Sequence, residues 1–366
     1  MAILYQNRIL FLMKKVLIIG SQGYLGSRLT DYLEDFGYNC SGSDVGFFQY
    51  GVLYNPKPVR NLGKAAQDIT EEDIKGHDVV IQLAGISNDP FGNLDPASIY
   101  DPTLEYALQI ARFCKKLGVR YIFPSSCSVY GIGEGELDEE GPTNPQTQYS
   151  LNKIQIEEGL AKLADANFSP IALRLATVFG CSPRIRFDVV INMLSGMAVA
   201  QRKLVLNSNG EAWRPHLHIE DFCEAIRCCL EWDYDKGKLL VLNVGRSDNN
   251  WRIIDIARLI QEVVAGTELE FLNQQSKSEA NDLVRDRKIQ DGVDKRTYKV
   301  NFDRIHQQLP NFSAKWDVES GVKQLLKDLK RLNLDEIKFR QRDFYRLQQL
   351  EHLNRTGQIK EPVYSL

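Results

Sequence analysis

Three glycines directly after a short apolar run constrain this chain more than any other feature. Residues 15–20 read KVLIIG, which is typical of a buried strand in a parallel sheet, and they lead into Gly20-Ser-Gln-Gly23-Tyr-Leu-Gly26. A helical stretch follows, with leucines at i, i+4 and i+8 (Leu25, Leu29 and Leu33). In such a unit the glycines serve the tight turn, the close approach of a pyrophosphate and the helix–strand contact. The motif predicts a dinucleotide site at a helix N-terminus, although glycines alone also fit an unliganded turn.

Asp44 narrows the choice of dinucleotide. It ends the second expected strand, 24 residues after Gly20, and an acidic residue at about that distance can hydrogen-bond the adenosine ribose hydroxyls. A carboxylate there repels a 2′-phosphate, so the sequence predicts NAD rather than NADP, with a solvated loop aspartate as the alternative. The other residues expected to contact the cofactor, in the glycine loop and after later strands, are Gln22, Tyr24, Leu25, Asp68, Ile69, Leu83, Ala84 and Gly85.

The first half of the chain alternates strand and helix patterns. The segments 38–43, 78–84, 119–123 and 170–179 predict strands. The segment 149–163 and a face made by Leu104, Leu108 and Ala111 predict helices. This alternation indicates an α/β fold, a Rossmann-type doubly wound parallel sheet. After Gly180 short apolar pieces interleave with polar and basic ones, which predicts a smaller C-terminal substrate-binding lobe.

The expected domain division follows from these patterns. The runs at 239–244 and 253–264 are expected to return to the large domain, and the stretch 334–366 is expected to form an amphipathic helix and tail that packs on the body or on a partner subunit. The division is an N-terminal extension at 1–13, an NAD-binding domain at 14–180 with return segments near 215–265, a substrate lobe mainly at 181–330 and a helical tail at 331–366.

Composition and charge exclude several classes of function. Lys and Arg number 45 against 48 Asp and Glu, a net charge of -3, so no basic field favours nucleic acid. The seven cysteines include no CxxC pair, which predicts reduced thiols in a cytoplasmic protein and no metal site. No apolar run approaches the roughly 18 residues of a membrane span. Residues 1–13 resemble a signal peptide only weakly, and Met13 is an alternative start.

A tyrosine and a lysine at helical spacing are the candidate catalytic pair. Tyr149-Ser-Leu-Asn-Lys153 places both side chains on one helical face. Tyrosine is a weak base at neutral pH, but a nearby ammonium favours the phenolate. Upstream, residues 124–131 (PSSCSVYG) end a strand on the side where open α/β sheets bind ligands, so one hydroxyl there could share a substrate hydroxyl with Tyr149.

Taken together, these motifs resemble an extended short-chain dehydrogenase/reductase of the nucleotide-sugar epimerase/dehydratase family typified by UDP-glucose 4-epimerase. The resemblance covers roughly residues 14–330. It rests on GSQGYLG, Asp44, DI at 68–69, LAGIS at 83–87, SSCSVYG at 125–131, YSLNK at 149–153 and RPHLHIED at 214–221.

The resemblance implies roles for individual residues. Tyr149 matches the family's catalytic tyrosine, Lys153 its ribose-binding lysine and Ser126 its catalytic Ser/Thr. Arg214 resembles the contact to the substrate diphosphate, with a surface arginine as the alternative. Further candidates for the substrate are Ser87, Arg184, Arg186 and Arg296. His216 and His218 receive no catalytic role.

Departures from the family pattern decide between reactions. Family dehydratases carry an Asp-Glu pair where this chain has Cys127 and Ser128, so elimination of water is disfavoured. Members that epimerise C3 and C5 carry a cysteine at the position of Ser128. In an extended segment neighbouring side chains face opposite ways, so Cys127 is not expected to replace it. Residues 175–177 (LAT) also replace the aromatic-Asn pattern of UDP-hexose 4-epimerases, which leaves sugar and nucleotide open.

The sequence therefore predicts a cytoplasmic, homodimeric NAD-dependent nucleotide-sugar epimerase that acts through a transient 4-keto sugar. A reductase of 4-keto nucleotide sugars would use the same residues once and is the first alternative. A catalytically silent NAD-binding subunit is the second. Intact Tyr149 and Lys153 argue against it, because such a subunit could lose either residue and keep the fold.

Overall fold

The computed structural model describes residues 14–85, 96–271 and 296–359, and its centre is a parallel sheet of seven strands. The strand order is β11-β7-β5-β4-β1-β2-β3. In chain order the strands are β1 (Lys15–Ile19), β2 (Asn39–Ser43), β3 (Arg60–Asn61), β4 (Val79–Gln82), β5 (Arg120–Ser126), β7 (Ile171–Leu175) and β11 (Leu240–Val244). The predicted α/β class and Rossmann-type sheet are confirmed.

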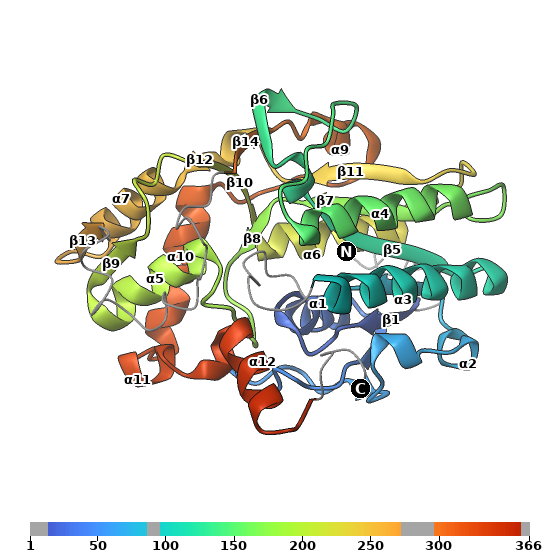
Figure 1. Ribbon diagram of the computed structural model, residues 1–366, viewed down its shortest axis with the longest axis horizontal. Helices are drawn as coiled ribbons and strands as arrows, with labels where there is room; N and C mark the ends of the chain where they lie inside the picture. Colours follow the sequence, from blue (N-terminus) through green and yellow to red (C-terminus); the bar gives the residue numbers. More distant parts are fainter. Residues whose placement is uncertain (1–13, 86–95, 272–295, 360–366) are drawn as a thin grey trace, which may run out of the picture.

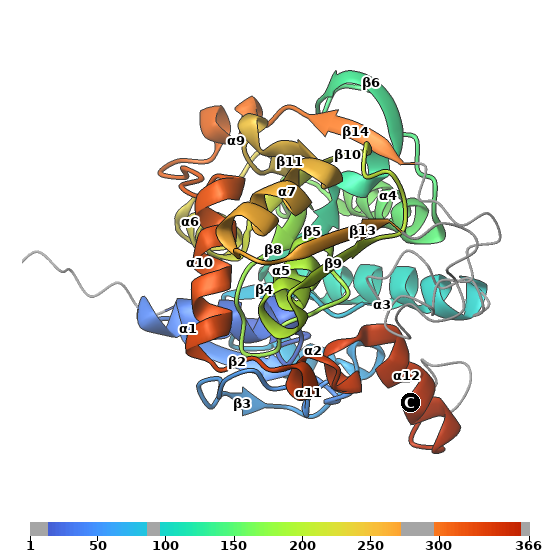
Figure 2. The ribbon, with the colours of Figure 1, turned by 90° about the vertical axis from the view of Figure 1, so that its left-hand side faces the viewer.

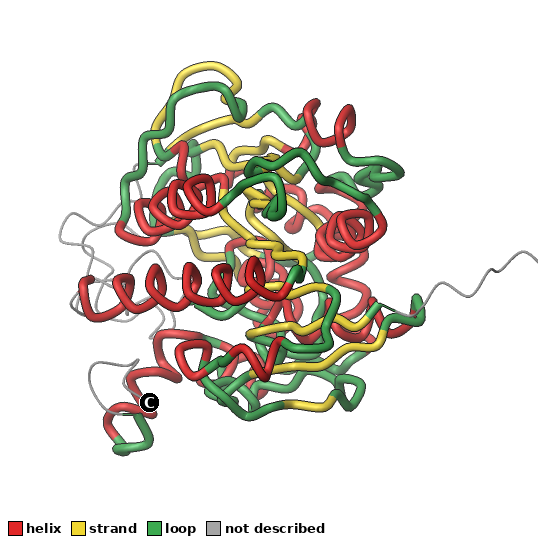
Figure 3. Tube along the Cα trace, turned by 90° about the vertical axis from the view of Figure 1, so that its right-hand side faces the viewer, coloured by secondary structure: helices red, strands yellow, loops and turns green. Residues whose placement is uncertain are grey.

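Helices cover both faces of this sheet (Figure 1). Alternate residues of β1 enter two separate cores: Val16 and Ile18 pack with the helices α1 and α6, and Leu17 and Ile19 pack with α3 and α4. Figure 3 shows the strands, in yellow, between red helices. The bounds are α1 (Tyr24–Asp35), η1 (Ala66–Asp68), α2 (Glu71–Ile74), α3 (Pro96–Leu117), α4 (Gln148–Leu163) and α6 (Ile219–Glu231). A strand buried on both faces explains the continuous apolar run at the start of the chain.

The strand order reverses beside β1, and this reversal locates the site. From β1 the chain continues through β2 and β3 on one side of the sheet, and through β4, β5, β7 and β11 on the other. Open α/β sheets bind ligands in the crevice at the carboxyl ends of the strands, at such a switch point. Gly20, Asp44, Leu83 and Ser126 all lie at the carboxyl ends of these strands.

The run at 170–179 forms two strands and not the single strand expected. β7 belongs to the large sheet, whereas β8 (Thr177–Phe179) pairs with β10 (Trp213–His218) in a separate sheet of order β12-β10-β8. Ala176, between the two strands, donates its N–H to the Val244 carbonyl at the end of β11. The apolar pattern continues across the break because both strands are buried in one core.

A second lobe surrounds these smaller sheets (Figure 2). The helix predicted at 253–264 is α7 (Ile253–Val263), and it packs on α5 and α10 in this lobe, whereas α6 and β11 do join the large sheet. The remaining elements are η2 (Cys127–Tyr130), β6 (Ile132–Leu137), α5 (Val190–Gln201), β9 (Lys203–Leu206), η3 (Ser247–Asn249), β12 (Asn250–Arg252), β13 (Glu268–Phe271), β14 (Thr297–Val300), α9 (Asp303–Gln308) and α10 (Val318–Arg331).

The C-terminal stretch is broken into short pieces where one amphipathic helix was expected. They are α11 (Glu336–Phe339), η5 (Arg342–Phe344) and α12 (Arg346–Arg355). Phe339 and Phe344 are fully buried and meet Phe187 edge-on, with ring centroids 4.9 and 5.4 Å away. The aromatic residues therefore anchor the stretch to the second lobe. Within the described ranges no helix has the length and apolar character needed to cross a membrane.

Candidate functional site

The glycine loop has the geometry of a dinucleotide-binding turn. Gly20 has φ +93°, and a Cβ on it would lie 2.6 Å from the Ala84 backbone nitrogen. A Cβ on Gly26 would lie 2.1 Å from the Gly20 carbonyl oxygen, so helix α1 can approach β1 only without a side chain there. Gly23 is the N-cap of α1 and provides no side-chain cap. The first N–H groups of this helix are therefore left for an anion, and the loop fits a pyrophosphate.

Asp44 lies against this loop. Its carboxylate accepts hydrogen bonds from Gln22 N at 2.9 Å and Gly46 N at 2.8 Å. Burial raises the pKa of Asp44, while these two bonds act in the opposite direction. Asn61, which the sequence analysis missed, holds the backbone of Asp44 on both sides through its amide. The arrangement brings an oriented carboxylate to the edge of the pyrophosphate loop, as NAD recognition requires.

The other residues expected near the cofactor lie after neighbouring strands. Leu83 N and Ala84 N both donate to the Ile19 carbonyl, which ties the end of β4 to the end of β1. Gly85 follows directly. Asp68 ends η1, and Ile69 after it is buried. Ser87 lies outside the described residues, so its expected substrate contact remains a prediction.

Tyr149, Lys153 and Ser126 are brought together by bonds between α4 and the end of β5. Lys153 Nζ donates to the Pro124 carbonyl at 2.8 Å and lies 5.5 Å from the centre of the Tyr149 ring. Ser150, next to Tyr149, bonds Ser128 at 3.2 Å between hydroxyls. Both contacts flank Ser126, so the three candidate catalytic residues share one edge of the sheet. Burial lowers the pKa of Lys153 to about 8, and Glu157 opposes this shift.

The three serines of this segment have different surroundings. Ser125 is buried and donates to Glu157, and Ser128 is buried beside Ser150. Ser126 is partly exposed, and its Oγ accepts from Ser128 N at 3.1 Å. A hydroxyl that accepts one bond still has its own proton to donate. Of the three serines, Ser126 is the one with a partly exposed side chain, and its role toward a substrate remains a prediction.

Cys127 cannot serve as an acid in the site. Residues 127–130 form the 3-10 helix η2, so the expectation of an extended segment at 126–128 was wrong. The Sγ of Cys127 donates to the Arg174 carbonyl at 3.1 Å, and Cys127 is 1% exposed. Burial raises the pKa of this thiol well above its usual value. That Cys127 does not replace the family's catalytic cysteine remains a prediction, and its structural argument is now burial rather than strand alternation.

A buried ion pair that was not predicted from the sequence lies beside the edge where β5 meets α4, which is called the catalytic edge below. Glu157 and Arg174 form a salt bridge with both carboxylate oxygens engaged, and the shortest N–O distance is 2.8 Å. Arg174 also donates to the Tyr130 hydroxyl at 3.0 Å. Glu157 follows Lys153 by one helical turn, a spacing that signals the shared face but not the partner on β7.

The four arginines expected to bind the substrate diphosphate fall into two pairs. Arg214 on β10 donates to the carbonyls of Trp213 and Arg296, so Arg214 and Arg296 are neighbours in the second lobe. Arg184 and Arg186 lie in the segment after β8. Arg184 Nη1 donates to the Gln49 carbonyl at 2.9 Å, and Arg186 forms a two-bond pair with Asp188. This second pair adjoins the cofactor loop, because Ser182 donates to the Tyr24 carbonyl at 2.7 Å.

His216 and His218 are buried side chains of β10. Burial lowers the pKa of each to about 3, so both are neutral at physiological pH. His218 accepts from Glu220 N at the start of α6 and stacks on Trp316 with centroids 4.5 Å apart. The lack of a catalytic role for either histidine remains a prediction.

This chain was compared with protein families and with solved structures. A model of the NAD dependent epimerase/dehydratase family matches residues 16–245. Three solved structures superpose on 87% of this chain and 98–99% of their own. They are the NAD-dependent NDP-hexosamine 5,6-dehydratase TunA of tunicamycin biosynthesis (18% identity, TM-score 0.73), UDP-N-acetylglucosamine 4-epimerase from Methanobrevibacter ruminantium M1 with UDP-N-acetylmuramic acid (20%, 0.72) and UDP-glucuronic acid 4-epimerase from Bacillus cereus with UDP-glucuronic acid and NAD (20%, 0.69).

Proposed function

The chain belongs to the NAD-dependent epimerase/dehydratase family of enzymes, and we propose that it is a nucleotide-sugar epimerase that acts through a transient 4-keto sugar. One observation carries the proposal. The Ser126, Tyr149 and Lys153 set is complete, while the neighbouring positions 127 and 128 hold a buried thiol and a serine in place of carboxylic acids. Such a site can oxidise and reduce a hydroxyl-bearing carbon, but positions 127 and 128 offer no carboxylic acid for a departing hydroxyl.

Each residue has a separate task in this proposal. Ser126 donates its free hydroxyl proton to the substrate oxygen and so orients it. Tyr149 removes the proton of the substrate hydroxyl and later returns it, and the ammonium of Lys153 stabilises the charge that Tyr149 acquires. NAD, when bound, supplies the hydride acceptor and donor. If the sugar presents its opposite face when the keto group is reduced, the stereocentre is inverted.

Substrate recognition is assigned to the second lobe. The Arg214 guanidinium lies 5.5 Å from the centre of the Tyr298 ring. It also donates a hydrogen bond to the carbonyl of Arg296, the residue before β14. A guanidinium presents paired donors that suit a phosphate, and an aromatic ring beside it suits a sugar or base. We assign the diphosphate of a nucleotide sugar to Arg214, with the Tyr298 ring beside it.

A panel of nucleotide hexoses incubated with the enzyme in deuterated water tests the function. We expect interconversion of 4-epimers with no deuterium at C5 and no loss of water, because no described group at 127 or 128 can assist elimination. Deuterium at C5 together with loss of one water would identify a dehydratase. Net consumption of NADH by a 4-keto sugar would identify the reductase alternative.

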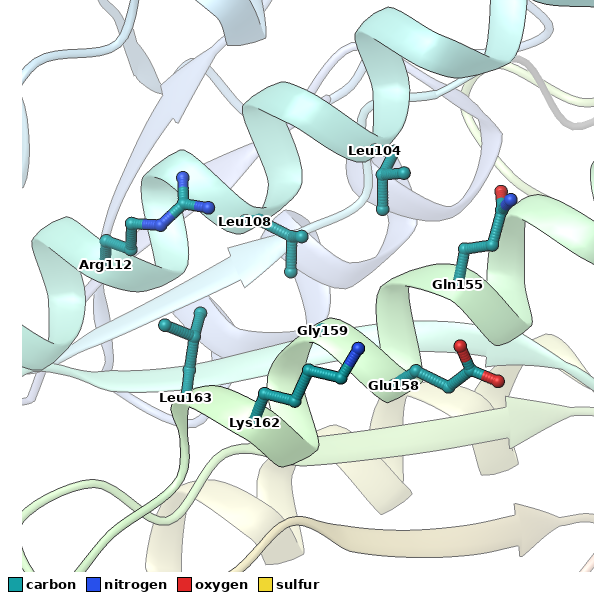
Figure 4. A pocket seen from close by; sticks show the side chains of 8 residues that line it. All are labelled: Leu104, Leu108, Arg112, Gln155, Glu158, Gly159, Lys162 and Leu163. Carbon is teal, nitrogen blue, oxygen red and sulfur yellow. The ribbon is translucent and has the colours of Figure 1, made fainter.

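We also propose a homodimer in which a second copy covers the hollow between α3 and α4 (Figure 4). This hollow of about 360 Å³ has an apolar floor of Leu104, Leu108 and Leu163. Leu104 and Leu108, which the sequence predicts on one helix face with Ala111, are partly buried and pack against the core that Tyr106 and Ile110 enter. A second copy that fills this hollow would bury the apolar surface that these leucines leave open, beside the polar side chains of Arg112 and Lys162.

Light scattering on the purified chain tests the assembly. We expect twice the chain mass for the wild type and for Ile337→Glu, a control at a residue that is 79% exposed on α11. Leu108→Glu should give monomers, since a carboxylate in this apolar floor is costly to bury. A monomeric wild type, or a dimer unaffected by Leu108→Glu, would contradict this interface.

A further inference from the structure

The C-terminal segment, residues 335–359, returns from the second lobe to the cofactor side of the molecule. Gln349 donates to the Phe47 carbonyl at 3.0 Å, and Lys338 donates to the Leu53 carbonyl at 3.0 Å, so the segment follows the loop after Asp44. Leu350 and Leu353 of α12 form an apolar cluster that includes Phe48 and the candidate base Tyr149. Figure 1 shows α12, in red, on the side of the molecule that carries the blue N-terminal loops.

This segment carries a third arginine to the pair after β8. Arg346 is 7% exposed, its guanidinium lies 4.0 Å from the centre of the Phe48 ring, and its Nη2 points to the Arg184 carbonyl at 3.5 Å. Arg184 and Arg186 are 9% and 8% exposed. The three arginines of this cluster, Arg184, Arg186 and Arg346, therefore lie together away from water.

The carboxylates around the cluster do not satisfy all three arginines. Asp188 takes both bonds from Arg186 and a third from the backbone of Arg346. Asp44 acts on Arg184 and Arg346 through space but gives its oxygens to Gln22 N and Gly46 N. Within the described part of the chain, the buried Arg184 Nε has no hydrogen-bond partner. An unpaired buried guanidinium donor is costly, so this geometry indicates an anion that the chain itself does not supply.

The position of the cluster indicates which anion. Ser182, two residues before Arg184, is bonded to the first turn of α1, and Asp44 connects the cluster to Gln22 of the glycine loop. The N-terminus of α1 and the unpaired Nε of Arg184 thus both adjoin the glycine loop, and both favour a diphosphate. Arg184, which the sequence assigned to the substrate's diphosphate, therefore lies on the cofactor side.

We propose that Arg184 and Arg346 bind the pyrophosphate of the dinucleotide, so that the C-terminal segment is part of the cofactor site. The inference rests on the NAD site described above and adds a residue from the opposite end of the chain. Because α12 packs against Tyr149, a pyrophosphate bound to Arg346 would hold α12 over the edge of the sheet that carries the candidate catalytic residues.

Calorimetric titration of the full-length chain with NAD and, separately, with UDP tests the proposal. Arg346→Met keeps the apolar contact with Phe48 and removes the charge, and we expect at least about tenfold weaker NAD binding with unchanged UDP binding. Arg355→Ala removes a charge from an exposed position of the same helix and should bind both ligands like the wild type. Unchanged NAD affinity in Arg346→Met, or a loss confined to UDP, would overturn the proposal.

A second measurement uses the wild type and does not depend on whether a variant folds. Hydrogen exchange of the amides at 344–355 should slow when NAD is added, because the bound diphosphate would hold Arg346 in place. Exchange at these amides that does not respond to saturating NAD would overturn the proposal even if the variants are unstable. A wild type that binds no NAD would refute the cofactor site as a whole, whereas normal NAD binding without these effects would refute only the role of the C-terminal segment.

Discussion

Arg174 and Arg346 are equally buried, at 7% exposure each, but they have opposite surroundings. Arg174 meets the Glu157 carboxylate and the Tyr130 hydroxyl, so acceptors from the chain surround its guanidinium. Arg346 lies against an aromatic ring and near two other arginines. The difference separates an arginine paired within the fold from one that, in the proposal above, binds the cofactor. It also separates the catalytic edge, where β5 meets α4, from the cofactor side, where the C-terminal segment returns.

The largest effect expected at the catalytic edge is on turnover. Tyr149→Phe should reduce kcat by roughly 10²–10⁴-fold, the contribution of a positioned acid–base group, and leave NAD binding intact. Steady-state rates and NAD titration measure the two quantities. Tyr50→Phe, at a tyrosine that is 72% exposed, is the matched control. A wild-type rate in Tyr149→Phe would remove Tyr149 from the mechanism.

The stability of the protein should depend on the pairing of Arg174 and not on the charge of Arg346. Glu157→Gln leaves Arg174 buried without a counter-charge and should lower the free energy of unfolding by about 3–5 kcal/mol. Arg346→Met should leave the ligand-free protein at least as stable as the wild type, since it removes a poorly paired charge. Chemical denaturation compares them, with Glu72→Gln, which changes a carboxylate that is 79% exposed in a surface ion pair, as the control. Equal losses in both variants would abolish the distinction.

Raising the pH should affect the catalytic edge through Lys153. Burial lowers the pKa of Lys153 to about 8, Glu157 being the opposing charge, so its ammonium is lost as pH rises through 8. We expect kcat/KM to fall above pH 8 with a slope approaching tenfold per pH unit. In Lys153→Arg, whose charge persists over this range, any residual activity should lack that decline. A decline of the same slope in both proteins would assign the titration to another group.

The smallest effect concerns the choice of cofactor. The wild type should bind NAD at least about tenfold more tightly than NADP, or about 1.4 kcal/mol, because the Asp44 carboxylate lies against the glycine loop and would repel a 2′-phosphate. Asp44→Asn keeps the shape and removes the charge, so the preference should shrink. Titration with both dinucleotides measures it, with Asp35→Ala at the exposed end of α1 as the control. Discrimination that survives Asp44→Asn would assign NAD selectivity elsewhere.

Much of the cofactor half could be predicted because its signals are local. The glycine spacing, Asp44 after the second strand and the four-residue step from Tyr149 to Lys153 each encode a turn or one face of a helix within a few residues. Local patterns gave a wrong prediction at 170–179, where one apolar run forms two strands that belong to different sheets. The catalytic roles, the domain division and a cytoplasmic homodimer remain predictions.

What the sequence determined alone is the Rossmann-type sheet, its cofactor turn and the composition of the catalytic edge, because periodicity and glycine placement act within one strand–helix unit. The tertiary structure decided which buried charges are paired. It joined Glu157 to Arg174, 17 residues away, and brought Arg346 to Arg184, 162 residues earlier in the chain. No spacing rule relates such positions. The packing of Phe339 and Phe344 on Phe187 brings the C-terminal segment to the cofactor side, and only that long-range contact makes Arg346 a candidate ligand-binding residue.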